Sequence, residues 1–293
     1  RSLVPHIAAA AAAARGRGGL RSPRRLVARK GRAHGWARAG GRGGRVWRAG
    51  VAGVGTLVGT VGLTFATFYA AGRSPMDVCK DSEWTKRYGC TPRTLPPISY
   101  TFNHLPERYI ALSGCSLAGL LMSCFYLGFY REMDRELRSA PGAPARLGAV
   151  LRWARRAGHI ASVGLVVTAA VSMKMHSMGH AVIASLFFVC GIAHIFLAFR
   201  LQALLARRPG APDRLFAPRS VALKKAALIL FAVLFVALVV CYAALPRGTV
   251  LQVVFPPAQW WTVATCLLAN LSLAMDLRHA DLRGPAEQAA NQA

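Results

Sequence analysis

Long apolar blocks separated by short charged segments dominate the pattern of hydrophobic and polar positions along this chain. From residue 49 onward each block is close to the roughly 17–25 residues that a helix needs to cross the hydrocarbon core of a bilayer. Because only a helix or a closed barrel satisfies its own backbone hydrogen bonds in lipid, we expect every block to be a helix. The six blocks are residues 49–71, 109–130, 157–175, 181–205, 226–245 and 260–275.

The positions of the basic residues predict how these helices are oriented. The chain has 37 Lys and Arg against 11 Asp and Glu, a formal charge of +26. Segments on one side of the six blocks hold 29 of the 37, and segments on the other side hold 8. Cytoplasmic loops carry the excess of Lys and Arg, so we expect both termini in the cytoplasm. No interleaved basic and aromatic motif of a nucleic-acid reader occurs, so we expect no nucleic-acid partner.

Three regions follow from this pattern. Residues 1–48 hold 13 basic residues, no acidic residue and no apolar periodicity, which predicts a disordered Arg-rich cytoplasmic tail. A targeting segment is the alternative for this tail. Residues 49–280 are the expected six-helix transmembrane domain, and residues 281–293 a short cytoplasmic tail. The fold class predicted is therefore all-α: a polytopic membrane protein with a six-transmembrane-helix bundle and a lumenal loop cap.

The expected cap is the segment 72–108, the longest loop on the side away from the cytoplasm. Its prolines restrict the backbone, so we expect it to pack against the bundle. It contains Cys79 and Cys90. A disulfide between them is the natural interpretation if the loop faces an oxidising compartment, and two unpaired thiols are the alternative. The other five cysteines fall in the apolar blocks, where a thiol behaves as a small hydrophobe.

Polar side chains with candidate chemistry gather on the same expected lumenal side. We chose five of them, by location, as a candidate site for a lipid headgroup. An acid at the start of a helix is also favoured by the helix dipole, so the glutamate among them has a structural explanation as well. The five residues are His104, Glu107 and Arg108 before the second block, and His176 and His180 before the fourth.

The turn before the fourth block also raises the question of a copper site. Met173, Met175 and Met178 lie beside the two histidines, and thioethers and imidazoles are ligands for Cu(I). No thiolate completes the set, and methionine is common in membrane helices for packing. We therefore expect no metal and no cofactor.

The apolar blocks contain few ionisable groups. His194 is the main exception, and it serves either helix packing or a polar cavity. This scarcity argues against a proton-coupled transporter or an ion channel. No hydrolase elbow, phosphate loop or zinc-protease helix occurs, and no positioned nucleophile and base are visible, so the residues do not favour an enzyme.

Three groups of landmarks together resemble one family of six-span membrane proteins. They lie in the expected lumenal loop, in the turn before the fourth block and around the last block. The landmarks are the cysteine pair followed by Pro97, Ile98 and Ser99 and then Pro106-Glu107-Arg108; His176 and Gly179 before an aromatic fourth block with Phe187, Phe188 and Gly191; and Gln259-Trp260-Trp261 with Asp276.

The family comprises the damage-regulated autophagy modulators (DRAM), the FGF-receptor-activating protein with the post-GPI-attachment lipid-remodelling proteins, and the N-terminal domain of the yeast CWH-type cell-wall protein. The resemblance covers about residues 50–280. Many members have Glu where this chain has Gln259, and some have an acidic residue and Gly where it has Tyr100 and Thr101. These departures bear on which subfamily the chain resembles and do not affect the expected six-span fold.

The resemblance implies a role in autophagy and lysosomal membranes, in remodelling the lipid of GPI anchors, or in organising phosphoinositide signalling. We therefore expect an integral membrane protein that acts on the lipid state of endomembranes (lysosome, Golgi or ER) or of the plasma membrane, without its own catalytic site. The alternatives are a membrane enzyme of acyl remodelling that uses the lumenal His and Glu residues, and a small-molecule transporter. Membrane lipids are the expected partners, with other membrane proteins as further candidates.

Overall fold

The computed structural model describes residues 40–73, 98–139, 145–206, 216–245 and 253–290, and within these ranges the chain forms helices and turns with no strand. The apolar blocks lie largely within the six long helices, so the all-α prediction is confirmed. The elements are α1 (Gly40–Ala70), α4 (Ile98–Thr101), α5 (Glu107–Ser139), α6 (Ala145–Ala170), α7 (Ser177–Ala206), α8 (Pro218–Ala244) and α10 (Phe255–Ala290).

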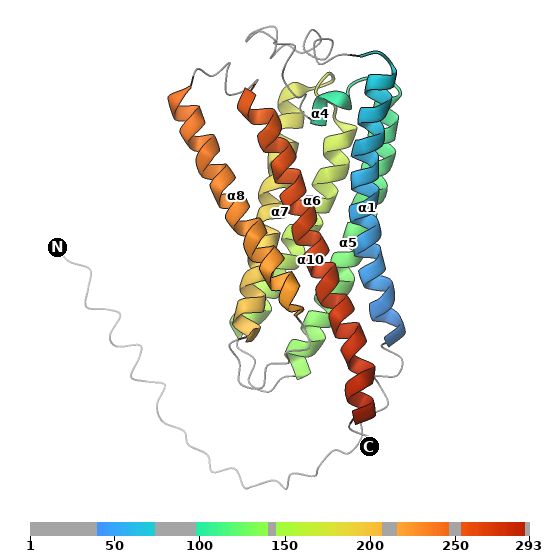
Figure 1. The fold of residues 1–293 in the computed structure, drawn as a ribbon, viewed down its shortest axis with the longest axis vertical. Helices are drawn as coiled ribbons and strands as arrows, with labels where there is room; N and C mark the ends of the chain where they lie inside the picture. The colour runs from blue at the N-terminus through green and yellow to red at the C-terminus, as the bar shows by residue number, and fades with distance from the viewer. Residues whose placement is uncertain (1–39, 74–97, 140–144, 207–215, 246–252, 291–293) are drawn as a thin grey trace, which may run out of the picture. The chain divides into compact units, whose positions relative to one another are not determined.

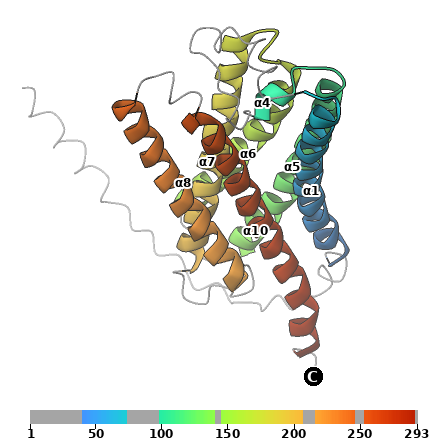
Figure 2. The same cartoon turned by 45° about the horizontal axis from the view of Figure 1, so that its top comes forward.

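The six long helices lie side by side and alternate in direction along the chain (Figure 1). Helix α1 packs against α5 and α10, α6 packs between α5 and α7, and α8 packs mainly against α10. The short helix α4 contacts α1 and α10 at one end of the bundle (Figure 2). We call this the α4 end. It also holds the ends of α1, α6 and α8 and the starts of α5, α7 and α10.

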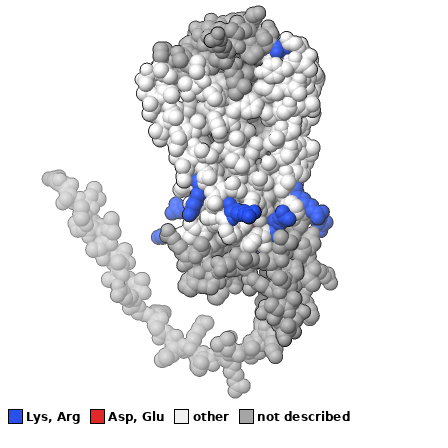
Figure 3. Space-filling view, in the orientation of Figure 1, with Lys and Arg blue, Asp and Glu red and all other residues white. Residues whose placement is uncertain are grey.

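The opposite end of the bundle carries most of the described Lys and Arg side chains, and we call it the basic end. Figure 3 shows them as a belt around one face of the molecule. The α4 end has only Arg73, Arg108 and Lys174 among the described side chains. The basic end has Arg45, Arg48, Arg131, Arg135, Arg138, Arg146, Arg152, Arg155, Arg156, Arg200, Arg219, Lys224, Lys225 and Arg278.

Five helices in the described part of the chain are long and apolar enough to cross a membrane: α1, α5, α7, α8 and α10. Their outward faces are apolar. In α8, for example, Val233, Val236 and Val240 are more than half exposed. Exposed apolar surface on this scale is rare in water-soluble monomers and is ordinary where the surroundings are lipid.

Helix α6 differs from the prediction made for the third apolar block. It ends at Ala170, before the predicted end at residue 175, and its first half carries Arg152, Arg155 and Arg156. Because of these charges, α6 has no stretch of spanning length that is as apolar as those of the other five helices. The six-helix bundle is present, and the sixth crossing stays a prediction.

Apolar clusters, two of them large, and close helix contacts hold the bundle together. The larger cluster fills the half toward the basic end with aromatic side chains of α5, including Phe125 and Tyr130, and the smaller one joins Ile98 and Phe102 to α5 and α6 near the α4 end. Small residues let membrane helices approach closely. An added Cβ at Gly114 of α5 would lie 2.8 Å from Thr60 Cβ of α1.

Candidate functional site

Glu107 is the centre of the polar contacts at the α4 end. It is the first residue of α5 and is fully buried. Its Oε2 accepts a hydrogen bond of 2.6 Å from Arg73 Nη1, just after α1, and Arg73 Nη2 also donates to the Leu105 carbonyl at 2.7 Å. Glu107 Oε1 is buried without a hydrogen-bond partner among the described residues. The carboxylate thus has one paired oxygen and one with unused acceptor capacity.

A second set of contacts ties the start of α5 and the segment before it to the turn between α6 and α7. Arg108 Nη2 donates to Met175 Sδ at 2.7 Å, and the Lys174 amide donates to Asn103 Oδ1 at 3.3 Å. Arg108 and Met175 were both singled out from the sequence, for different reasons. The structure brings them together because α5 and α7 both begin at the α4 end.

The two histidines of the α6–α7 turn have local roles. His176 Nδ1 accepts a hydrogen bond of 2.9 Å from the Gly179 amide, as a cap on the first turn of α7. His180 is buried, and its Nδ1 donates to the Val171 carbonyl at 2.6 Å. Its Nε2 is buried and has no hydrogen-bond partner in the described part of the chain.

The five candidate headgroup residues therefore divide into separate groups. Glu107 pairs with Arg73, Arg108 meets Met175, and the described hydrogen bonds of the histidines His176 and His180 stay within the turn. His104 is half-buried in the segment that joins α4 to α5. The described contacts place no histidine against the glutamate.

Three of the sulfur and nitrogen atoms considered as copper ligands are engaged in other contacts. Met175 Sδ accepts from Arg108, and both Nδ1 atoms of the turn are in hydrogen bonds. No group of three or more His, Cys, Asp or Glu side chains within the described ranges is arranged to hold a metal ion.

Two of the family-like landmarks meet at the α4 end. The Ile98 amide at the start of α4 donates to Gln259 Oε1 of α10 at 3.1 Å. Beside it, the ring of Trp260 packs edge-on against Phe65 of α1, with centroids 4.8 Å apart. Ile98 and Ser99 are buried. The hydrogen bond between Ile98 and Gln259 docks α4 on α10 across 161 positions of sequence, which no local pattern reveals.

Other landmarks lie apart from this contact or outside the described residues. Pro106 is exposed and Gly179 is half-buried. Cys79, Cys90 and Pro97 fall in residues 74–97, so the disulfide and most of the predicted loop cap lie outside the described residues. The five cysteines of the apolar blocks (Cys115, Cys124, Cys190, Cys241 and Cys266) are free thiols.

Sequence reasoning missed a buried ion pair near the basic end. Lys224 Nζ of α8 donates to Asp276 Oδ2 of α10, and both side chains are almost fully buried. Asp276 Oδ1 also accepts from the Ala217 amide at 3.1 Å, and Ser220 accepts a hydrogen bond of 2.7 Å from Lys224. The predicted fifth block began at residue 226, so Lys224 was assigned to a loop. The sequence did contain a signal for this pair: Asp276 follows the sixth apolar block and Lys224 precedes the fifth, so both were expected on the same side of the membrane.

A second polar group lies in the interior of the bundle around His194 of α7. His194 Nδ1 is 3.0 Å from the Ala154 carbonyl of α6 and 3.2 Å from the Tyr130 hydroxyl of α5. The Tyr126 ring packs at a tilt against the imidazole ring, with centroids 4.4 Å apart, and its hydroxyl donates to Asn270 Oδ1 of α10 at 2.5 Å. Of the two roles expected for His194, these contacts support helix packing.

Five apolar helices of spanning length, with exposed apolar side chains on their outward faces, define a multi-pass integral membrane protein. A family model, the Frag1/DRAM/Sfk1/Cwh43P N-terminal domain, matches residues 51–280. The chain belongs to this family. The match confirms the predicted resemblance and its extent. No curated protein and no solved structure gives a significant match to the chain.

Proposed function

We propose that this protein acts on the lipid state of endomembranes without its own catalytic site, by holding a lipid headgroup at the α4 end. The observation that carries the proposal is Glu107. A fully buried carboxylate with one oxygen on Arg73 and the other unpartnered has acceptor capacity for a donor group such as a headgroup hydroxyl or amine. The buried His180 Nε2 adds a second polar atom without a described partner at the α4 end.

The distribution of charge supports an orientation in which this site faces the lumen. The belt of Lys and Arg lies toward the end where α1 begins and α10 ends (Figure 3). By the positive-inside rule that end is cytoplasmic, together with both termini, and the α4 end is lumenal. This orientation requires α6 to be the sixth crossing, because α5 ends and α7 begins on opposite sides.

The contacts at the α4 end favour binding over catalysis. General acid–base or nucleophilic chemistry needs a base within hydrogen-bond reach of the group it activates. His176 instead caps α7 and His180 binds a backbone carbonyl, while Glu107 is held by a guanidinium group. An acyl-remodelling enzyme that uses these residues is the weaker alternative for that reason.

The site is tested by substituting the four uncharged or acidic candidates together, His104, Glu107, His176 and His180, each with Ala. We expect this variant to reach its membrane but to fail to restore the normal lipid composition of endomembranes in cells that lack the wild-type protein. A control with Glu132→Ala and Asp134→Ala removes two carboxylates from the other end of α5 and should restore function. Full function of the fourfold variant at normal abundance would overturn the headgroup site.

The two branches of the family's biology are separated by location and phenotype. Residence in the Golgi or ER, with loss or altered lipid of GPI-anchored surface proteins after deletion, assigns the protein to anchor remodelling. Residence in lysosomes, with normal GPI-anchored proteins and altered autophagic flux, assigns it to autophagy. A single experiment with a C-terminally tagged full-length chain and a deletion line measures both.

A further inference from the structure

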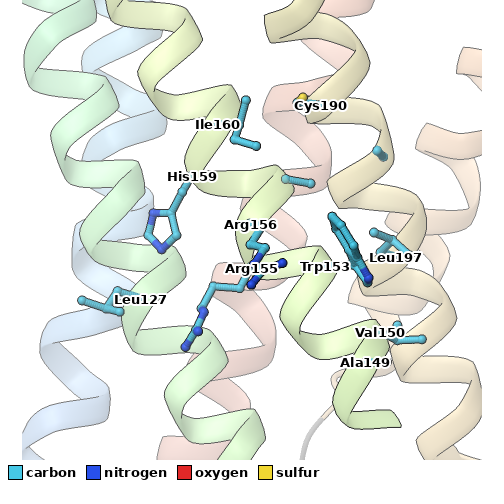
Figure 4. Close-up of a pocket in the computed structure, with 12 residues that line it drawn as sticks. Leu127, Ala149, Val150, Trp153, Arg155, Arg156, His159, Ile160, Cys190 and Leu197 are labelled. Atoms are coloured by element: carbon cyan, nitrogen blue, oxygen red, sulfur yellow. The ribbon is translucent and has the colours of Figure 1, made fainter. Parts of the chain in front are cut away.

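A groove lies on the outer face of α6, flanked by α5 and α7, far from the α4 end. It has a volume of about 850 Å³, within the range of about 300–1,000 Å³ that ligand pockets occupy. Figure 4 shows His159 extending from α6 toward α5, where Leu127 forms the opposite wall, and Trp153 beside Leu197 of α7. The groove opens sideways from the bundle, because Trp153 and Ile160 are 60% and 46% exposed.

The lining is mainly apolar, and two arginines of α6 bring positive charge to it. Cys190, Ala193 and Leu197 of α7 supply the apolar wall, and Arg155 and Arg156 of α6 supply the charge. Arg156 also packs over the ring of Trp153, at 5.3 Å from its centroid. Helix α6 has no acidic residue. No carboxylate in the described part of the chain forms an ion pair with Arg155 or Arg156, whereas Arg135 and Arg138 of α5 pair with Glu132 and Asp134.

The surroundings of the groove indicate what kind of molecule fits it. The flanking helices α5 and α7 are membrane-spanning by length and composition, so lipid reaches the apolar wall. The two arginines lie in the belt of the basic end, where long cationic side chains and Trp meet the headgroup layer. Basic pockets between membrane helices bind anionic lipid headgroups, because phosphate oxygens accept the guanidinium hydrogen bonds.

We propose that this groove binds one anionic phospholipid of the leaflet at the basic end, with its phosphate at Arg155 and Arg156 and an acyl chain along Cys190, Ala193 and Leu197. The site is separate from the headgroup site proposed at the α4 end and does not depend on it. Charge complementarity selects this occupant over a second copy of the chain, since the described surface around the groove is itself cationic.

The test measures the affinity of purified full-length protein in non-ionic detergent for fluorescent phosphatidylserine, with unlabelled phosphatidylserine and phosphatidylcholine as competitors. We expect phosphatidylserine to compete and phosphatidylcholine to compete poorly. The double variant Arg155→Ala with Arg156→Ala should weaken binding about tenfold or more, since each basic residue near an anionic lipid contributes appreciably to binding. Arg155→Lys with Arg156→Lys should retain most of the affinity.

Two further variants make the result specific to the groove. Arg131→Ala with Arg219→Ala removes the same charge from exposed positions of the basic end outside the groove, and should bind like the wild type. Ala193→Trp fills the apolar wall without changing charge and should weaken binding. Equal competition by the two lipids would overturn the proposal. So would equal losses of affinity in the two double-arginine variants, or the finding that a second copy of the chain occupies the groove in place of lipid.

Discussion

At the scale of single residues, the Lys224–Asp276 pair decides how α8 is attached to the bundle. Most side chains of α8 face outward, and its buried contacts concentrate on α10 near this pair. A buried ion pair contributes little relative to an apolar replacement, but removal of one partner leaves an uncompensated charge. Besides pairing with Lys224, Asp276 accepts a hydrogen bond from the backbone amide of Ala217, the residue just before α8.

Lys224→Met should therefore lower the free energy of unfolding by about 3 kcal/mol, because Asp276 is left buried without its cation. Adding Asp276→Asn should restore more than half of the loss, since the amide oxygen still accepts from Ala217. Lys225→Met is the matched control, because this neighbour is exposed. Unfolding midpoints of the purified variants in detergent measure all three, and equal values for K224M and K225M would contradict the structural role.

At the scale of elements, glycines set the spacing of the helices. An added Cβ at Gly114 would lie 2.8 Å from Thr60 Cβ, and one at Gly158 would lie 2.8 Å from His194 Nδ1. In contrast, nothing lies within 4 Å of the position that a Cβ would take at Gly59. The same residue type therefore marks contact between α1 and α5 at one position and open surface at another.

Gly114→Ala should destabilise the bundle by about 1–3 kcal/mol, because Thr60 cannot move its Cβ without moving α1. Gly59→Ala should be neutral or slightly stabilising, since Ala is the better helix former. Thermal unfolding in one detergent compares the two variants directly. A Gly114→Ala protein as stable as Gly59→Ala would show that α1 and α5 are farther apart than the structure has them.

The docking of α4 on α10 makes a prediction about Gln259. Gln259→Glu keeps an oxygen that accepts from the Ile98 amide, so we expect near wild-type stability. Gln259→Leu leaves that part-buried amide without its acceptor and should cost about 1–2 kcal/mol. Hydrogen exchange at the Ile98 amide gives a local measurement, and faster exchange only in the Leu variant is the expected result. Equal protection in both variants would remove Gln259 from the docking of α4.

At the scale of the whole molecule, the helical segments were predictable and their long-range contacts were not. An apolar run of spanning length must form a helix to satisfy its backbone hydrogen bonds in lipid, and all six blocks lie largely inside helices. The helices extend into the charged segments because hydropathy marks only the part expected in hydrocarbon. For the same reason the arginines of α6 lie within the helix. Helix α6 ends earlier than expected because the apolar residues Val171, Met173 and Met175 belong to the turn that follows it.

The candidate site was predictable only as a location. The sequence places Glu107, His176 and His180 on one side of the membrane, but the partners Arg73, Gly179 and Val171 depend on how chain turns fold. The Ile98–Gln259 and Lys224–Asp276 contacts join segments far apart in sequence. Tertiary packing alone determines such pairs, so a single sequence does not reveal them.

The predicted topology has both termini on the cytoplasmic side. Short epitope tags placed at the C-terminus and within residues 209–212 should be accessible to antibody after selective permeabilisation of the plasma membrane. A tag within residues 246–250 should become accessible only when internal membranes are also opened. Accessibility of the C-terminal tag and the 246–250 tag under the same condition would mean an even number of crossings between them, which excludes α10 as a single crossing.

The most direct test of a role in membrane lipid state is the lipid composition of endomembranes purified from cells that lack the protein. We expect a shifted composition that the wild-type chain and the Glu132→Ala, Asp134→Ala control restore, and that the fourfold variant at His104, Glu107, His176 and His180 does not. An unchanged composition after deletion, or full restoration by the fourfold variant, would contradict a lipid role that depends on the α4 end.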